Sequence, residues 1–206
     1  MLVSELRYVF HVIVRPFDGF WDLKHEKRGS LRTAMILLAA AVLTFLLVRR
    51  YTGFLFNRIN VLYVNFFTEV IGFLLIYVLF ITSNWCLTTL MDGKGTYRDI
   101  AVATAYALVP YILINAPLVA LSNFITIEEG EFYYFFVTIS YIWTGGLILI
   151  GTMVTHEYTM GKTILTLIFV VLGMVVMIFL GLLFFSVIQK MIGLVYVLYK
   201  EIKFRL

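Results

Sequence analysis

One carboxylate, that of Glu69, stands within a long uncharged stretch. It is the single charged residue between Ile59 and Met91, and charged groups inside a bilayer are costly and often mark ion paths, proton relays or paired partners. At helical spacing Asn65 and Gly72 share its face, so the three would form a polar strip. Alternatively the helix begins near Thr68 and Glu69 lies among the lipid headgroups, the interpretation we favour.

Three further residues are candidates for an intramembrane role. Asn84 lies one helical turn before Thr88, near the other end of the same apolar run, and Asn115 lies within a later run. Hydrogen bonds between helices are the role we predict for these amides, each contributing about 0.6 kcal/mol on average. Pro110 lies about ten residues inside that later run, where proline removes a backbone hydrogen bond and predicts a kink.

Residues that could form a metal or catalytic centre are sparse. The three histidines (His11, His25 and His156) fall in distant segments, and the sequence HEYTM at His156 has Met160 where a zinc-binding HExxH motif has its second histidine. The lone Cys86 excludes an internal disulfide or a cysteine cluster. No Ser/His/Asp or Cys/His arrangement stands out. We therefore predict no catalytic residue, metal or cofactor, and a protein that is not an enzyme.

The Gly-rich segment DGKGTYRD resembles a phosphate-binding loop only superficially. A Walker motif needs four residues between its first glycine and the Gly-Lys pair, and no strand precedes this segment. The segment instead predicts a tight turn that uses the backbone freedom of Asp92–Gly93. Thr96 would then cap the helix that follows.

Composition assigns the whole chain to a membrane. Of 206 residues, 62% are hydrophobic and 14% charged, against about 45–50% and 25% in soluble domains. Polar residues are too few to cover a soluble globule of this size. The net charge of +4 requires no nucleic acid, because basic residues commonly flank membrane spans and meet anionic lipid.

Uncharged runs locate five membrane-spanning helices, since a span needs roughly 20 apolar residues. The predicted spans cover residues 31–48, 63–88, 100–121, 133–154 and 163–186. Alternating alanines from Ala101 to Ala107 predict a central, closely packed third span, and Gly145–Gly146 and Gly151 predict close contacts on the fourth. The fold class is therefore an all-α polytopic membrane helical bundle of five transmembrane helices.

Residues 1–30 carry apolar side chains at helical spacing opposite a polar face, which predicts an amphipathic helix lying in the membrane interface and ended or kinked at Pro16. The alternative is a helix packed on the polar end of the bundle. The remaining domains are a membrane domain, 31–188, and a basic amphipathic tail, 189–206. The fifth span would continue into this tail along the membrane surface.

The side of the C-terminus is ambiguous. With a cytoplasmic N-terminus and five spans, nine Lys and Arg residues lie inside and seven outside, a weak preference by the positive-inside rule. If residues 163–199 formed a hairpin turning near Gly181, the count would become thirteen against three. That turn would lack Pro or Asn, so we retain five spans.

The order of three motifs resembles a known family. A Pro-Phe aromatic segment (RPFDGFWDL) precedes the spans, a Gly-rich turn (DGKGTYRDI) joins the second to the third, and the third carries a mid-span proline (ATAYALVPYIL). Together they resemble the Yip1-domain family, and its bacterial members more than the eukaryotic ones. The resemblance implies five helical spans and a cytoplasmic N-terminus. It supplies no catalytic residues, and the link of eukaryotic members to vesicle traffic and Rab-type GTPases depends on longer N-termini than this one.

Two classes of function follow. The first is a non-enzymatic scaffold or accessory subunit that binds other membrane proteins, binds a second copy of itself, or organises lipid. The second is a transporter or channel component for a small solute or lipid, with the polar residues and the kink lining a cavity. Against transport, we find no repeat among the spans, whereas transporters are generally built from paired repeats. We expect a multi-pass protein of a bacterial plasma membrane that contacts lipid and binds no nucleic acid.

Overall fold

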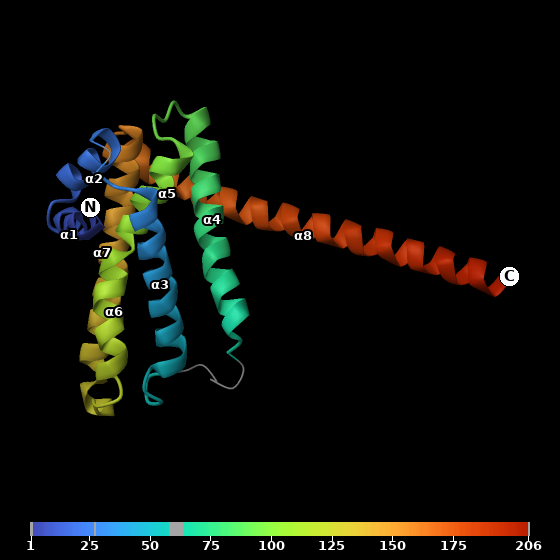
Figure 1. The fold of residues 1–206 in the computed structure, drawn as a ribbon, viewed down its shortest axis with the longest axis horizontal. Helices are drawn as coiled ribbons and strands as arrows, with labels where there is room; N and C mark the ends of the chain where they lie inside the picture. Colours follow the sequence, from blue (N-terminus) through green and yellow to red (C-terminus); the bar gives the residue numbers. More distant parts are fainter. Residues whose placement is uncertain (1, 27, 58–63, 206) are drawn as a thin grey trace.

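The computed structural model describes residues 2–26, 28–57 and 64–205, in which all regular structure is helical (Figure 1). In chain order the elements are α1 Leu2–Val14, α2 Pro16–His25, α3 Leu31–Tyr51, α4 Phe66–Leu90, α5 Tyr97–Ala107, α6 Val109–Leu121, the short 3-10 helix η2 Ile127–Glu129, α7 Gly130–His156 and α8 Met160–Arg205. Five segments are long and apolar enough to cross a membrane: Leu31–Tyr51, Phe66–Leu90, Tyr97–Leu121, Ile127–His156 and Met160–Phe204. The predicted five-span helical bundle is therefore confirmed. Residue 63, the first of the predicted second span, lies outside the described residues.

The third span consists of two helices, α5 and α6, that meet at Leu108. A kink is predicted at Pro110; the structure instead has a break between two helices at Leu108, and Pro110 lies in the first turn of α6, where its missing N–H is tolerated. α5 packs against α3, α4 and α7, and Ala103, Ala105 and Ala107 are buried there. The alanine-rich segment is thus the centre of the bundle, as predicted, because small side chains allow neighbouring helices to approach closely.

The turn before α5 also follows the prediction, with one difference. Thr96 caps α5: its hydroxyl accepts a hydrogen bond from the Asp99 N–H, while the Asp99 carboxylate accepts one from the Thr96 N–H. The left-handed backbone lies at Asp92 (φ 58°) and at neither glycine of the turn. Aspartate tolerates this conformation, so the glycines must serve another purpose.

The N-terminal segment folds as two helices, α1 and α2, separated at Pro16 as predicted. Val12 and Phe20 are buried against the bundle. The segment therefore packs on the bundle, while exposed apolar side chains remain at Phe10, Val14, Phe17 and Trp21. A membrane-interface position for this exposed face stays a prediction, and the side chains of residues 2–7 lie outside the description.

α8 is one continuous helix, so the hairpin considered for residues 163–199 is wrong: Gly181 lies mid-helix, with neither Pro nor Asn beside it to form a turn. Only its first part packs on the bundle, mainly against α4, which it crosses at a steep angle, and the rest projects away (Figure 1). The predicted boundary between residues 188 and 189 falls within this helix. The division into three domains stays a prediction.

The glycines of α7 differ from the prediction. A Cβ atom added at Gly145 or Gly146 would meet nothing within 4 Å, whereas one at Gly151 would lie 3.1 Å from Cε1 of Phe20. The predicted close contact is therefore wrong for the Gly145–Gly146 pair and present at Gly151. The physical reason is helix rotation: the pair lies on a face of α7 that no other described helix approaches closely.

Candidate functional site

The residues considered as a polar strip, Asn65, Glu69 and Gly72, lie at the start of α4, next to the end of α3. Asn65 caps α4, its Oδ1 accepting from the Phe67 N–H, and Glu69 lies in the first turn. Its Oε2 is 3.2 Å from Nε of Arg49, in the last turn of α3. Both charges lie at helix ends whose dipoles favour them. No other described residue comes within 4 Å of a Cβ placed at Gly72.

The remaining predicted residues are dispersed. Asn115 is 2% exposed, and its Nδ2 donates to Ser140 Oγ on α7 at 2.8 Å, the predicted interhelical hydrogen bond. Asn84 is buried near the opposite end of α4 from Glu69, and its Oδ1 has no partner among the described residues. These side chains and Pro110 are not brought together into one polar path.

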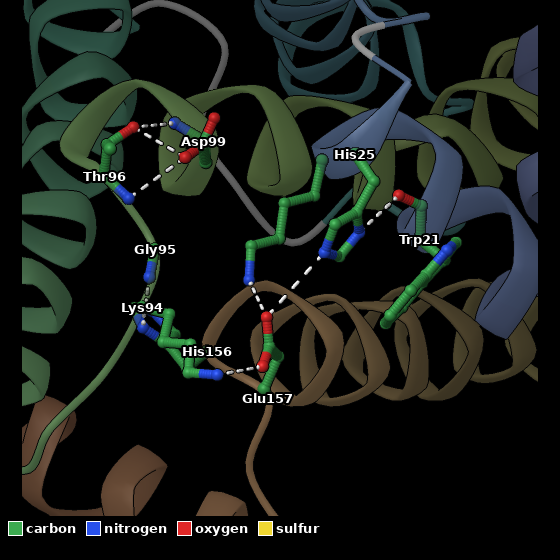
Figure 2. Close-up of polar contacts among 9 residues, drawn as sticks. Trp21, His25, Lys94, Gly95, Thr96, Asp99, His156 and Glu157 are labelled. Carbon is green, nitrogen blue, oxygen red and sulfur yellow. Dashed lines mark hydrogen bonds and ion pairs between the residues drawn. The ribbon is translucent and has the colours of Figure 1, made fainter.

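Side chains distant in sequence converge instead at Glu157, which follows the last residue of α7 (Figure 2). Its Oε1 lies 2.7 Å from Nζ of Lys24 at the end of α2. Its Oε2 lies 2.6 Å from Nζ of Lys94 in the turn between α4 and α5. His25 approaches the same carboxylate at 3.7 Å. We call Lys24, Lys94 and Glu157 the carboxylate clamp, because one side chain ties three segments together.

The two lysines determine the charge state of the clamp. Hydrogen bonds from Lys24 and then Lys94 lower the pKa of Glu157 from its ordinary value of 4.5 to about 2, because both stabilise the ionised carboxylate. Glu157 also adopts the left-handed conformation that ends α7 (φ 56°). At neutral pH the clamp therefore holds one negative charge between two positive ones.

His156 lies beneath the clamp and is 1% exposed. Its Nδ1 accepts a hydrogen bond from the Gly95 N–H at 3.4 Å, and its ring stacks on Tyr158 with 5.5 Å between centroids. A Cβ on Gly93 would lie 2.6 Å from Nδ1 of His156, and one on Gly95 would lie 2.8 Å from Cε1. The turn therefore needs both glycines because its backbone passes against the imidazole.

A small polar cavity of about 10 Å³ lies beside His156, lined also by Asn84, Thr104 and Thr155. Its volume is near the minimum for one water molecule. Asn84 Oδ1 and His156 Nε2 are both buried without a partner among the described residues. In the same part of the chain, no three His, Cys, Asp or Glu side chains cluster closely enough to hold a metal ion. The contacts around Glu157 and His156 therefore join the ends of helices to one another.

A second, larger cavity opens within the membrane-spanning part of the bundle, and we call it the lateral cavity. Its volume is about 360 Å³. It lies where α5 meets α6, between them and the middle portions of α4 and α7. The lining residues are Phe45, Phe73, Ile76, Tyr77, Phe80, Thr104, Leu108, Tyr111, Tyr141, Thr144, Ile148 and Met174. None carries a charge, and most are aromatic or aliphatic.

Comparison with known proteins assigns the chain to a family. The family model of the Yip1 domain matches residues 10–182. The chain belongs to the Yip1-domain family. No curated protein and no solved structure matched the chain.

The matched range of the Yip1 domain includes the carboxylate clamp and the lateral cavity. It ends next to Gly181, so most of the projecting part of α8 lies beyond it. The matched range therefore covers most of the helical bundle, whereas the part of α8 after residue 182, which makes few contacts with the bundle, lies outside it.

Sequence reasoning missed the clamp and the lateral cavity of this Yip1 domain. Glu157 and Lys94 are 63 residues apart, and hydropathy cannot reveal which two turns meet at one end of a bundle. The local signal was two glycines that flank Lys94 without either taking a positive φ. Glycine without unusual backbone geometry indicates that another group approaches closely, although it does not identify that group.

Proposed function

We propose that this Yip1-domain protein is a non-enzymatic membrane scaffold or accessory subunit, and that it binds another membrane protein through the projecting part of α8. We place it in a bacterial plasma membrane with a cytoplasmic N-terminus. On that assignment Lys24 and Lys94 face the cytoplasm, in agreement with the positive-inside rule. The acidic loop that contains Glu128 and Glu129 then lies outside.

The exposure of α8 is the observation that carries this proposal. Val170 is fully buried, and a Cβ on Gly173 would press against Ser83 of α4. Beyond Gly173 the described side chains of α8 are exposed or half-buried to the end of the helix. At 1.5 Å per residue, the segment from residue 175 to 205 extends about 45 Å beyond the bundle, at a steep angle to α3 and α4 (Figure 1).

One face of this extension has the composition of a helix–helix contact. Ser186 and Gly193 are seven residues apart and therefore lie on the same side of α8, with Gln189 between them. Small residues allow a second helix to approach closely, and Ser and Gln can form hydrogen bonds with it. The occupant we propose is an apolar transmembrane helix of another protein. Gly181 lies about 120° around the helix from Gly193 and provides a matched control.

Site-specific photo-crosslinking in the native membrane tests this proposal. A photoreactive residue at Val197, 56% exposed on the extension, should yield one discrete cross-linked membrane protein, whereas one at Leu75, 53% exposed on α4, should yield only diffuse products. In the same assay Gly193→Ile should abolish the Val197 product by blocking close approach, and Gly181→Ile should not. Equal products from Val197 and Leu75, or no effect of Gly193→Ile, would refute binding at this face.

The alternative function, transport of a small solute or lipid, receives less support. A pathway through the bundle would bring Glu69, Asn84 and Asn115 along one route. Glu69 and Asn84 instead lie near opposite ends of α4, and Asn115 is hydrogen-bonded to Ser140. We therefore retain the scaffold proposal.

A further inference from the structure

We propose that the lateral cavity binds one hydrocarbon chain of a bilayer lipid. It is lined by the middle of α4, from Phe73 to Phe80, and the middle of α7, from Tyr141 to Ile148. Both segments belong to spans that cross the membrane, so the cavity lies at the depth of lipid acyl chains. This binding site is independent of the partner proposed for α8.

The packing of α4 explains why the cavity exists. α4 packs on α8, α5 and α3 but makes little contact with α6 or α7. At the same level the third span is interrupted at Leu108, and Leu108 is one of the residues that line the cavity. A continuous helix that packed along α4 would close this space. The interruption and the separation of α4 together leave it open.

The cavity presents mostly hydrocarbon, because most of its lining is aromatic or aliphatic and two of its five hydroxyl groups bond to backbone carbonyls instead. The Tyr77 hydroxyl donates to the Ala101 carbonyl at 2.7 Å, and the Thr104 hydroxyl donates to the Ile100 carbonyl at 2.7 Å. The Thr144 hydroxyl, in contrast, is buried without a partner among the described residues. Cavities of this apolar kind stay dry and accept apolar molecules. A volume of about 360 Å³ is within the usual range of ligand pockets, about 300–1,000 Å³.

Ile76 indicates how a chain enters. This residue lines the cavity and yet is 61% exposed, so the cavity wall at Ile76 is also part of the outer surface of α4. That surface contacts the bilayer. An acyl chain can therefore slide in sideways while its headgroup remains at the membrane surface. A polar solute would have to cross hydrocarbon before reaching the cavity.

Photolabelling with a defined lipid tests the proposal. The full chain is reconstituted in vesicles of phosphatidylcholine, a small fraction of which carries a mid-chain diazirine, and labelled residues are mapped by mass spectrometry. The label should concentrate on α4 from Phe73 to Phe80 and on α7 from Tyr141 to Ile148. Ile76→Trp should fill the opening and reduce this labelling about tenfold, the change expected when two chain methylenes are no longer buried.

Two control variants make the result decisive. Ile71→Trp places the same side chain on α4 at a residue that is 63% exposed and does not line the cavity, and it should leave the labelling unchanged. Thr144→Val should also leave it unchanged, because a hydrocarbon occupant needs no hydrogen bond. Labelling spread evenly over all lipid-facing residues, or equal loss in Ile71→Trp and Ile76→Trp, would overturn the proposal. Loss of labelling in Thr144→Val would show that the occupant carries a polar atom and would likewise overturn it.

Discussion

Glu157 lies in a short turn, yet its side chain contacts two segments that are distant in sequence. Its two carboxylate oxygens contact lysines from α2 and from the turn that precedes α5. Apolar packing, the hydrogen bond between Gly95 and His156, and a hydrogen bond from the Tyr158 hydroxyl to the Met91 carbonyl join the same segments. The clamp therefore adds two ion pairs to the contacts that hold these three helix ends together.

The substitution Glu157→Gln should lower the thermal unfolding temperature of the detergent-solubilised protein by about 2 °C, the modest effect expected of solvent-accessible ion pairs. Because folding lowers the pKa of Glu157 from 4.5 to about 2, its stabilising contribution is complete above pH 4.5 and disappears as the pH falls towards 2. Melting curves between pH 7 and pH 2 should therefore converge for the two proteins at low pH. The control Glu128→Gln alters an exposed residue at the other end of the bundle and should show no such convergence. A difference that persisted at pH 2 would contradict the role of the ionised carboxylate.

At the scale of elements, close helix packing depends on single glycines that hydropathy cannot distinguish. Gly19 lies against the backbone of Val12: a Cβ there would come within 2.7 Å of the Val12 Cα atom. Gly145 on α7 has no neighbour within 4 Å of its own Cβ position. Both residues are glycines within helices, yet only Gly19 lies where two helices approach each other closely.

The substitution Gly19→Ala should therefore destabilise the protein by about 1–3 kcal/mol, since inserting a methyl group against backbone forces α1 away from α2. The matched change Gly145→Ala should be neutral or stabilising by up to about 1 kcal/mol, because alanine favours a helix over glycine. Denaturant unfolding in mixed micelles measures both. Equal effects of the two substitutions would show that α1 does not pack on α2 as described.

The elements could be predicted from sequence where the cause is local. Pro16 and Pro110 interrupt helices through their own backbone chemistry, and Thr96 forms a cap with a residue three positions away. Contacts between segments could not be predicted, because helical periodicity defines an apolar face but not its partner. This is why Gly145–Gly146 was wrongly expected to form a contact. It is also why the sequence does not indicate that Glu157 pairs with Lys24 and Lys94.

On the scale of the whole molecule, the loops divide into two groups at opposite ends of the bundle. The clamp gathers the end of α2, the α4–α5 turn and the end of α7. At the other end, Gly53 donates its N–H to Ser122 Oγ at 2.8 Å, and Phe56 stacks on Tyr133 with 4.9 Å between centroids. Helix packing thus places the described start of the α3–α4 connection, residues 52–57, beside the α6–α7 connection. If α3 to α7 cross the membrane, these two groups lie on opposite sides of it.

Labelling of single cysteines with a membrane-impermeant maleimide in intact cells tests this arrangement in a Cys86→Ser background. Phe54→Cys and Glu128→Cys should react, because both exposed positions lie on the side proposed to be outside. Arg98→Cys, exposed at the start of α5, should react only after the membrane is permeabilised. Reaction of all three in intact cells would contradict the five-span topology, and the reverse pattern would place the N-terminus outside.

The pairing of α4 with α8 has a consequence for biogenesis. Ser83 donates its hydroxyl to the Val170 carbonyl at 2.7 Å, within the interface of these two helices. Ribosomes complete α4 well before Val170 is translated, and at about 5–20 residues per second the delay lasts roughly ten seconds. During that time the newly inserted helix lacks the acceptor that Ser83 uses in the folded protein and presents an unoccupied packing surface to the insertion machinery. A chain that terminates before Val170 never covers that surface, and we expect it to be recognised as incompletely assembled in the membrane.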